Sequence, residues 1–102
     1  MGIFDKRPPD RDEIFEILHE QKDIKITHII SSSKLSDNWY DQSEDEFVVV
    51  LEGEAVLEIE QREIRLKKGE HIFIKAHTKH RVLSCSDNTH WLSVHINNST
   101  PI

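Results

Sequence analysis

The feature that most constrains the fold is a short apolar run in the middle of the chain, Phe47 to Leu51. Three of its five residues are valine, and it is too short for a helix of ordinary length. Gly53 follows closely, and glycine adopts a left-handed turn at little cost. A β-branched run without polar alternation is typical of a strand covered on both faces. We therefore expect a strand inside a small barrel or sandwich, with the carboxylate of Glu46 at its start and a hairpin at its end.

Short segments of alternating apolar and polar residues lie on both sides of this run. Together with it they predict eight strands, over residues 24–31, 35–40, 47–51, 55–60, 63–66, 71–75, 80–85 and 90–97. Turn-forming residues separate the segments at close, regular spacing, and Gly53 and Gly69 are the expected positive-φ positions. Many short strands at such spacing indicate an all-β sandwich or barrel.

The first 23 residues predict a different kind of structure. Pro8-Pro9 excludes a helix before Asp10, and Asp10 with Glu13 three residues later forms the pattern of a helix-capping box. Apolar residues then fall on one helical face, at Ile14, Ile17 and Leu18. We expect an arm and a short N-terminal helix over residues 1–23, a barrel over residues 24–97 and a tail over residues 98–102.

Length and charge restrict the function. A chain of 102 residues forms one domain, and any site lies in or on its single core. The net charge is −6, and no basic patch occurs beyond the segment 65–68, so nucleic acid and anionic membranes are poor partners. No apolar run follows the N-terminal charges, and the single cysteine, Cys85, fits a reducing compartment. We expect a cytoplasmic protein.

Two glycine-bounded patterns resemble the paired motifs of the cupin superfamily. Glu46, six residues and Gly53 match the end of the first motif, and Gly69 and His80 match the second with its spacing. The resemblance covers residues 24–97 and is closest to small single-domain bacterial cupins. It implies an all-β, cupin-type jelly-roll barrel, preceded here by the short N-terminal helix.

The motifs are degenerate, because four of their ten positions are retained. Residues that differ from the motif stand at Lys34, at Tyr40 and Gln42 (or Trp39 and Asp41 with a longer gap), and at Lys75, His77 and Ser84. The metal site of the family uses three histidines and one glutamate. Only Glu46 and His80 carry over to this chain, residue by residue.

The resemblance also implies a divalent metal ion in the barrel, namely zinc, iron, nickel or manganese. Such an ion needs three or four converging N/O ligands, of which Glu46 and His80 would supply two. The remaining candidates are the carbonyl oxygen of Gln42, Asp41 if the strand entry bulges, and His77 from its loop. The alternative is a site without metal, in which Glu46 pairs with His80 or Arg81 and Gln42 and Tyr40 hydrogen-bond across the cavity.

Three functions follow from these residues. The first is a metal-dependent enzyme acting on a small polar molecule, with Tyr40 as a proton donor. The second is a metal-free module that binds a small ligand. The third is a structural homodimer, with the strand 24–30 and the N-terminal arm at its interface. His95 and Trp91 line the pocket if their face of the last strand points inward; His19, His28 and His71 receive no role.

Overall fold

The computed structural model describes residues 2–97 and consists almost entirely of β-strands. A single 3-10 turn, η1 (Ile3–Asp5), precedes them. Within the described range no helix is long and apolar enough to span a membrane, and the expected tail at 98–102 lies outside it. The strands are β1 (Glu13–Gln21), β2 (Ile24–Ser31), β3 (Asp45–Glu52), β4 (Glu54–Ile59), β5 (Arg62–Lys67), β6 (His71–Ile74), β7 (His80–Cys85) and β8 (Thr89–Ile96).

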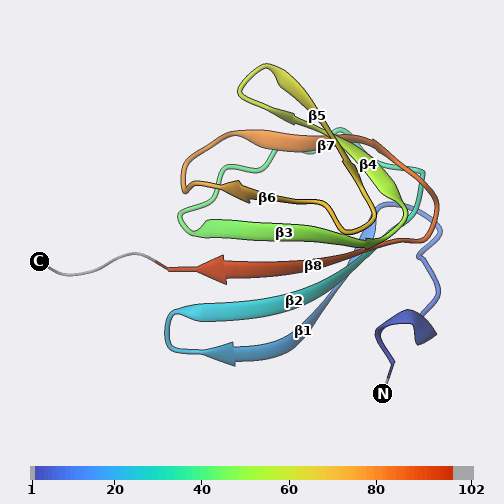
Figure 1. Cartoon of the computed structure of the whole chain (residues 1–102), viewed down its shortest axis with the longest axis horizontal. Coiled ribbons are helices and arrows are strands. Elements are labelled where there is room, and N and C mark those ends of the chain that lie inside the picture. The colour runs from blue at the N-terminus through green and yellow to red at the C-terminus, as the bar shows by residue number, and fades with distance from the viewer. Residues whose placement is uncertain (1, 98–102) are drawn as a thin grey trace, which may run out of the picture.

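The strands form two antiparallel sheets that face each other, as Figure 1 shows. The larger sheet has five strands in the order β1-β2-β8-β3-β6, and the smaller has three in the order β5-β4-β7. Every strand pair is antiparallel. The expectation of an all-β jelly-roll barrel is therefore confirmed.

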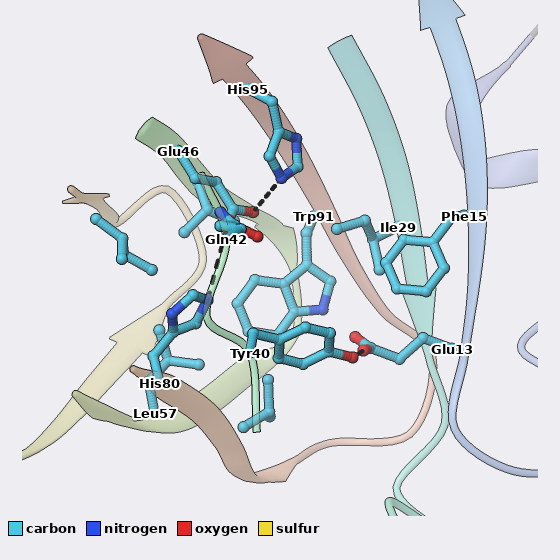
Figure 2. A pocket seen from close by; sticks show the side chains of 13 residues that line it. Glu13, Phe15, Ile29, Tyr40, Gln42, Glu46, Leu57, His80, Trp91 and His95 are labelled. Carbon is cyan, nitrogen blue, oxygen red and sulfur yellow. Dashed lines mark hydrogen bonds and ion pairs between the residues drawn. The ribbon is translucent and has the colours of Figure 1, made fainter. Parts of the chain in front are cut away.

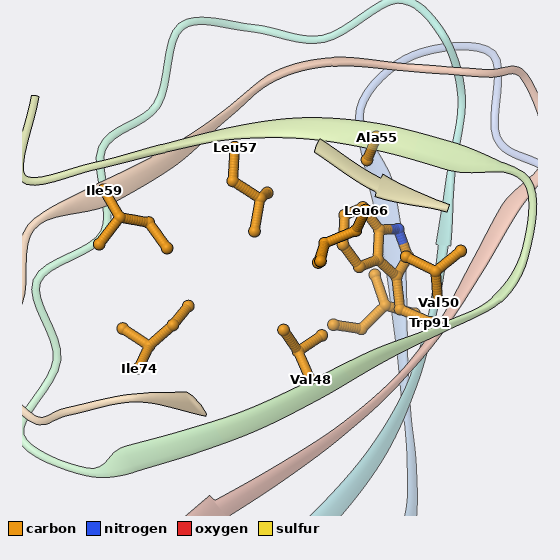
Figure 3. Packing of buried hydrophobic residues seen from close by; sticks show 9 residues of the cluster. Val48, Val50, Ala55, Leu57, Ile59, Leu66, Ile74 and Trp91 are labelled. Carbon is orange, nitrogen blue, oxygen red and sulfur yellow. The ribbon is translucent and has the colours of Figure 1, made fainter. Parts of the chain in front are cut away.

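The core lies between the two sheets and is built from alternate residues of each strand (Figure 3). On β3, Val48 and Val50 point into the core, whereas Phe47 and Val49 are half-buried on the opposite face. The central apolar run is thus fully covered on one face only. Its partners across the core, on the smaller sheet, are Ala55, Leu57, Ile59 and Leu66, and Ile29, Ile74 and Trp91 flank it on the larger sheet. Burying each of the valine, leucine and isoleucine side chains contributes roughly 1.5 to 3 kcal/mol, which holds the two sheets together.

The expected N-terminal helix is wrong, because its residues form strand β1 at the edge of the larger sheet. Residues 13–21 pair with β2 over their whole length, with one bulge between Ile17 and His19. Asp10 does not cap a helix. Asp12 instead adopts a left-handed conformation (φ 57°), and its carboxylate accepts hydrogen bonds from the backbone N–H and the hydroxyl of Ser36. The chain is thereby turned into an extended strand at Glu13.

The expected strand over residues 35–40 is also wrong. That segment is a loop, and its only bridge to a strand joins Tyr40 to His80. The count of eight strands nevertheless agrees with the expectation, because β1 takes the place of this segment. The hairpin at Gly53 (φ 92°) and the turn at Gly69 (φ 85°) are confirmed.

The sheet order corrects the expected dimer contact. The strand 24–30 belongs to β2, which is paired on both sides, with β1 and with β8. Its backbone groups are therefore not available to a second copy. The free edges of the larger sheet are β1 and β6.

Candidate functional site

Glu46 and His80 meet in the space between the two sheets. Glu46 is the second residue of β3 in the larger sheet, and His80 begins β7 in the smaller one, so they approach from opposite walls rather than from neighbouring strands. His80 Nε2 lies 3.7 Å from Glu46 Oε1, and both residues are buried. The expectation that these two residues point into one cavity is confirmed (Figure 2).

The Glu46 carboxylate is held at both of its oxygen atoms. Gln42 Nε2–H donates to Oε1 at 2.9 Å, and the Ser93 hydroxyl donates to Oε2 at 2.6 Å. His95 Nε2 lies 3.7 Å from Oε2, on the side away from His80. The carboxylate therefore sits between two imidazoles.

The loop before β3 reaches this cluster through backbone hydrogen bonds to β7 and to the loop that precedes β7. Tyr40 and His80 exchange two of them, at 2.7 and 3.0 Å, and the carbonyl of Gln42 accepts one from His77 at 2.7 Å. The rings of Tyr40 and His80 stack with their centroids 5.7 Å apart. These contacts direct the side chains of Tyr40 and Gln42 into the pocket.

The charges of Glu46 and His80 stabilise each other. Burial alone would raise the pKa of Glu46, but contact with His80, the Ser93 hydroxyl and the charge of His95 outweigh it and lower that pKa. Burial alone would lower the pKa of His80, but Glu46 and the Thr78 carbonyl, which accepts Nδ1–H at 2.8 Å, raise it. The geometry thus favours a carboxylate–imidazolium pair.

A second carboxylate, Glu13, lines the other side of the pocket. It accepts hydrogen bonds from the Ser31 hydroxyl at 2.6 Å and from the Tyr40 hydroxyl at 3.2 Å. Burial raises the pKa of Glu13, and burial together with Glu13 raises the pKa of Tyr40 to about 12. Tyr40 therefore keeps its proton firmly at neutral pH, and its role as a proton donor remains a prediction.

Between these polar ends the pocket wall is apolar and aromatic. The wall is formed by Phe15, Ile29, Val48, Leu57, Ile74, Val82 and Trp91. The indole N–H of Trp91 donates to Ser31 Oγ at 2.9 Å, which fixes the ring across the centre of the pocket (Figure 2). The cavity volume is about 80 Å³, enough for roughly two or three water molecules or a ligand of that size.

Two of the expected metal ligands lie apart from this cluster. The side chains of Asp41 and His77 are exposed and face each other, with His77 Nδ1 3.8 Å from Asp41 Oδ1. Neither lines the pocket, whereas Gln42, Glu46 and His80 do. The metal-binding role of these five residues stays a prediction.

The donor set does not fit a metal centre as it stands. Within residues 2–97 no group of three or more His, Cys, Asp or Glu side chains is arranged to hold an ion. Both oxygens of Glu46 already accept hydrogen bonds, and Gln42 turns its N–H rather than its carbonyl oxygen toward them. The two imidazoles lie on opposite sides of the carboxylate instead of converging with it on a common point.

The sequence identified only part of this site. The prediction that Trp91 and His95 line the pocket depended on the direction of one face of the last strand. That face does point inward. Ser93 lies between them on the same face, and the same alternation could have identified it as a neighbour of the pocket that donates to Glu46. Glu13 was missed because the segment was interpreted as a helix.

Comparison with known proteins agrees with this architecture. A family model described as a cupin domain matches residues 33–95. A crystal structure from Ralstonia eutropha, provisionally named a mannose-6-phosphate isomerase, has 35% sequence identity and a TM-score of 0.84. The match covers 95% of this chain and 96% of that one. No curated protein matches the sequence.

Two more distant structures share the fold alone. A cupin superfamily protein from Desulfitobacterium hafniense is 17% identical (TM-score 0.77; 88% of this chain, 84% of that one). KdgF from Halomonas is 15% identical (TM-score 0.77; 84% of this chain, 81% of that one). The family model covers more than half of the chain, including both Glu46 and His80. The chain therefore belongs to the cupin family.

Proposed function

We infer that the protein binds a small organic molecule in its barrel pocket without the help of a metal ion. The observation that carries this proposal is the position of Glu46 between His80 and His95, at the polar end of an otherwise apolar cavity. A buried carboxylate needs a compensating charge, and His80 supplies it here. The pocket then offers an apolar wall and one polar anchor, the usual composition of a small-molecule site.

The charge of the pocket favours an uncharged or cationic ligand. Among the described residues, no Lys or Arg lines the cavity, and two carboxylates, Glu13 and Glu46, do. Phosphate recognition usually relies on Arg, Lys or a helix N-terminus. Although the similar Ralstonia protein carries the name of a sugar-phosphate isomerase, a phosphorylated sugar suits this pocket poorly.

The pocket suits a ligand that has one polar group and one apolar part. An alcohol or amine group would fit at the Glu46–His80 pair, where a donor and an acceptor lie side by side. The remaining atoms would lie against Trp91 and the aliphatic wall. With a cavity of about 80 Å³, a ligand of roughly three or four heavy atoms fills it.

A divalent metal in the same pocket is the competing function. The observation in its favour is that two imidazole Nε2 atoms, of His80 and His95, both lie 3.7 Å from the Glu46 carboxylate. If an ion were held here, these three residues would hold it, and the ion would act as a Lewis acid toward the ligand. The hydrogen bonds that already occupy Glu46 speak against this arrangement.

Cys85 supports a reducing compartment such as the cytoplasm. Its thiol is half-buried and donates to the Ser32 carbonyl at 3.2 Å, and burial raises its pKa. The thiol therefore serves packing and has no activated thiolate.

The test is a thermal-shift screen of small alcohols, amines and carboxylates with EDTA present throughout. We expect some alcohols or amines to raise the melting temperature, and the Glu46→Gln variant to lose most of that shift while the exposed-residue control His19→Gln keeps it. Stoichiometric metal in protein purified without chelator, lost in His80→Ala together with ligand binding, would refute the metal-free function.

A further inference from the structure

Of the two carboxylates that line the pocket, Glu13 is the one without a counter-charge. Its oxygen atoms accept hydrogen bonds from the hydroxyl groups of Ser31 and Tyr40, which are neutral donors. No ion pair involves Glu13 within the described part of the chain. Burial raises the pKa of Glu13, and the negative charge of Glu46 raises it further. Glu46 itself has His80 as its cation, so only the Glu13 end of the cavity lacks a positive charge.

Three aromatic side chains accompany Glu13 in the cavity wall. Phe15, Tyr40 and Trp91 line the cavity, as Figure 2 shows. The Tyr40 hydroxyl donates to Glu13 directly. The indole N–H of Trp91 donates to Ser31, whose hydroxyl in turn donates to Glu13. Aromatic faces attract cations, and a set of rings around one point is a common receptor for organic ammonium groups. A carboxylate without a counter-charge among three rings therefore suits such a cation.

A second hollow adjoins the cavity at this end and is also negatively charged. Its volume is about 140 Å³. It shares four lining residues with the first cavity, namely Glu13, Phe15, Tyr40 and Val82. The charged side chains among its lining residues are Glu13 and Asp12, and hydrogen bonds from Ser36 lower the pKa of Asp12. Charges of one sign in a hollow raise the local concentration of ions of the opposite sign. Cations are therefore attracted toward Glu13 from this side.

We propose that Glu13 and the three rings bind the ammonium group of a short amino alcohol, whose hydroxyl group lies at the Glu46–His80 pair. Tyr40 shows that one small molecule can reach both ends, because its ring stacks on His80 while its hydroxyl donates to Glu13. An extended two-carbon amino alcohol is about as long as that phenol ring, and its size matches the cavity of about 80 Å³. This inference rests on the proposed function and names the chemical class of its ligand.

The hydrogen bonds of Glu13 leave room for the ammonium group. An ionised carboxylate accepts at about four positions, of which the two hydroxyl groups occupy two. The ammonium group therefore donates to Glu13 without displacing Ser31 or Tyr40. Its charge also supplies the cation that the protein places beside Glu46 but not beside Glu13.

The first experiment compares two ligands of the same shape by isothermal titration calorimetry at pH 7 with EDTA present. The probes are 2-aminoethanol, which is protonated at this pH, and ethylene glycol, which carries no charge. We expect the wild type to bind 2-aminoethanol at least about tenfold more tightly, because hydrogen bonds between charged groups are the stronger ones. Equal affinities, or tighter binding of the glycol, would overturn the inference and leave the proposed function standing. Binding of neither probe would also overturn the inference, and the proposed function would then be decided by the wider screen.

The second experiment repeats both titrations with variants that separate the two ends of the pocket. Glu13→Gln should reduce the affinity for 2-aminoethanol to that for ethylene glycol, whereas Glu46→Gln should weaken both probes, because both place a hydroxyl group there. Phe15→Leu should weaken 2-aminoethanol roughly two- to fivefold through the lost ring, and the control Phe73→Leu on β6, outside the pocket, should change neither affinity. A preference for the amine that survives Glu13→Gln and disappears in Glu46→Gln would place the ammonium group at the other end, and the inference falls.

A measurement without ligand tests the charge of Glu13 itself. Because the burial of Glu13 is not compensated by a cation, Glu13→Gln should melt at or above the temperature of the wild type at pH 7. Glu46→Gln should melt lower, because it removes one partner of a buried pair. Added 2-aminoethanol should then raise the melting temperature of the wild type and leave that of Glu13→Gln unchanged. A Glu13→Gln variant as unstable as Glu46→Gln would mean that Glu13 already has its counter-charge, which contradicts the inference.

Discussion

One glutamate and two histidines form a cluster at each face of the larger sheet, and the pKa of histidine is raised in the inner cluster, at His80, but lowered in the outer one, at His28 and His90. On the inner face, Glu46 lies between His80 and His95. On the outer face, His28 Nδ1 lies 3.9 Å from Glu16 Oε1, and His28 Nε2 is hydrogen-bonded to His90 Nδ1 at 2.9 Å. Each cluster thus contains one glutamate and two histidines; the outer cluster lies wholly on the larger sheet, whereas the inner cluster takes His80 from the smaller sheet.

The two clusters differ in the residue that supplies the counter-charge of the glutamate. Glu16 is bound by Lys6 of the N-terminal arm, so it does not depend on a histidine for its counter-charge. His28 and His90 are almost completely inaccessible to water, and burial lowers the pKa of both. Glu46 has no lysine or arginine partner within the described residues, and its charge instead raises the pKa of His80. The comparison teaches that burial lowers the pKa of His28 and His90, whereas at His80 contact with an otherwise unpaired carboxylate outweighs burial and raises the pKa.

The substitution with the largest expected effect is Glu46→Gln. It keeps the shape of the side chain and removes the charge, which leaves His80 buried without its counter-ion. Removing one partner of a buried pair costs about 3 kcal/mol in the free energy of unfolding. Urea denaturation at pH 6 measures it, and Glu16→Gln, whose partner Lys6 is half exposed, should cost less than about 1 kcal/mol. Equal losses in the two variants would mean that the inner pair is not ionic.

A pH series should separate the two clusters by sign. The raised pKa of His80 means that its contribution to stability is complete below the unfolded value of 6.5 and is lost as the pH rises through the folded value. The lowered pKa values of His28 and His90 mean that their contribution is present above 6.5 and is lost as the pH falls through the folded values. The window from pH 7.5 to 5.5 therefore contains two opposed effects.

We expect His80→Gln to lose more stability than the wild type on acidification across this window, and His28→Leu/His90→Leu to lose less. Melting temperatures measured in half-unit pH steps give the slopes, and His19→Gln on the exposed end of β1 serves as the control. If both variants changed the slope of the wild type in the same direction, the opposite pKa shifts of the inner and outer histidines would be contradicted.

Sequence patterns predicted seven of the strand regions in outline but missed β1, for a physical reason. Inner strands bury alternate residues, so their pattern has a period of two, as in β4. An edge strand exposes both faces, and apolar residues at Ile14, Phe15, Ile17 and Leu18 fit a helical face as well as a strand. The turn at Asp12, with its positive φ, left no signal that distinguishes it from the capping pattern at Asp10.

Residues that belong to a sequence motif could be predicted to lie in the site. Contacts that depend on the register of two strands could not be predicted. Glu46, Gln42 and His80 followed from motif spacing and do meet in the pocket. His28 and His90 are 62 residues apart, and their contact depends on the register of β2 against β8. Nothing local in the sequence reports that register, so His28 received no role.

Replacing the outer pair as a whole should have a smaller effect than breaking the inner one. His28→Leu/His90→Leu exchanges two neutral, buried, mutually bonded imidazoles for apolar side chains of similar size. It also removes His28 Nδ1, which is buried and lacks a hydrogen-bond partner. Such a paired replacement should change the free energy of unfolding by about 1 kcal/mol or less at pH 7.5. His28→Leu alone, which leaves His90 Nδ1 unpaired, should be the less stable of the two variants by urea denaturation.

The smallest expected effect concerns Phe4, which contacts the His90 ring edge-on with the centroids 5.1 Å apart. Phe4 is itself 57% exposed, so Phe4→Ala should lower the free energy of unfolding by less than about 1 kcal/mol. It should nevertheless admit water to the outer pair, and because burial is what lowers the pKa of His90, that pKa should rise toward its ordinary value. NMR titration of the histidine ring protons measures the shift, with Phe73→Ala as the control on the same face. An unchanged His90 pKa would mean that the sheet itself, and not Phe4, excludes water from the outer pair. The N-terminal arm would then play no part in setting the pKa of His90, whereas the residues around the pocket do set that of His80.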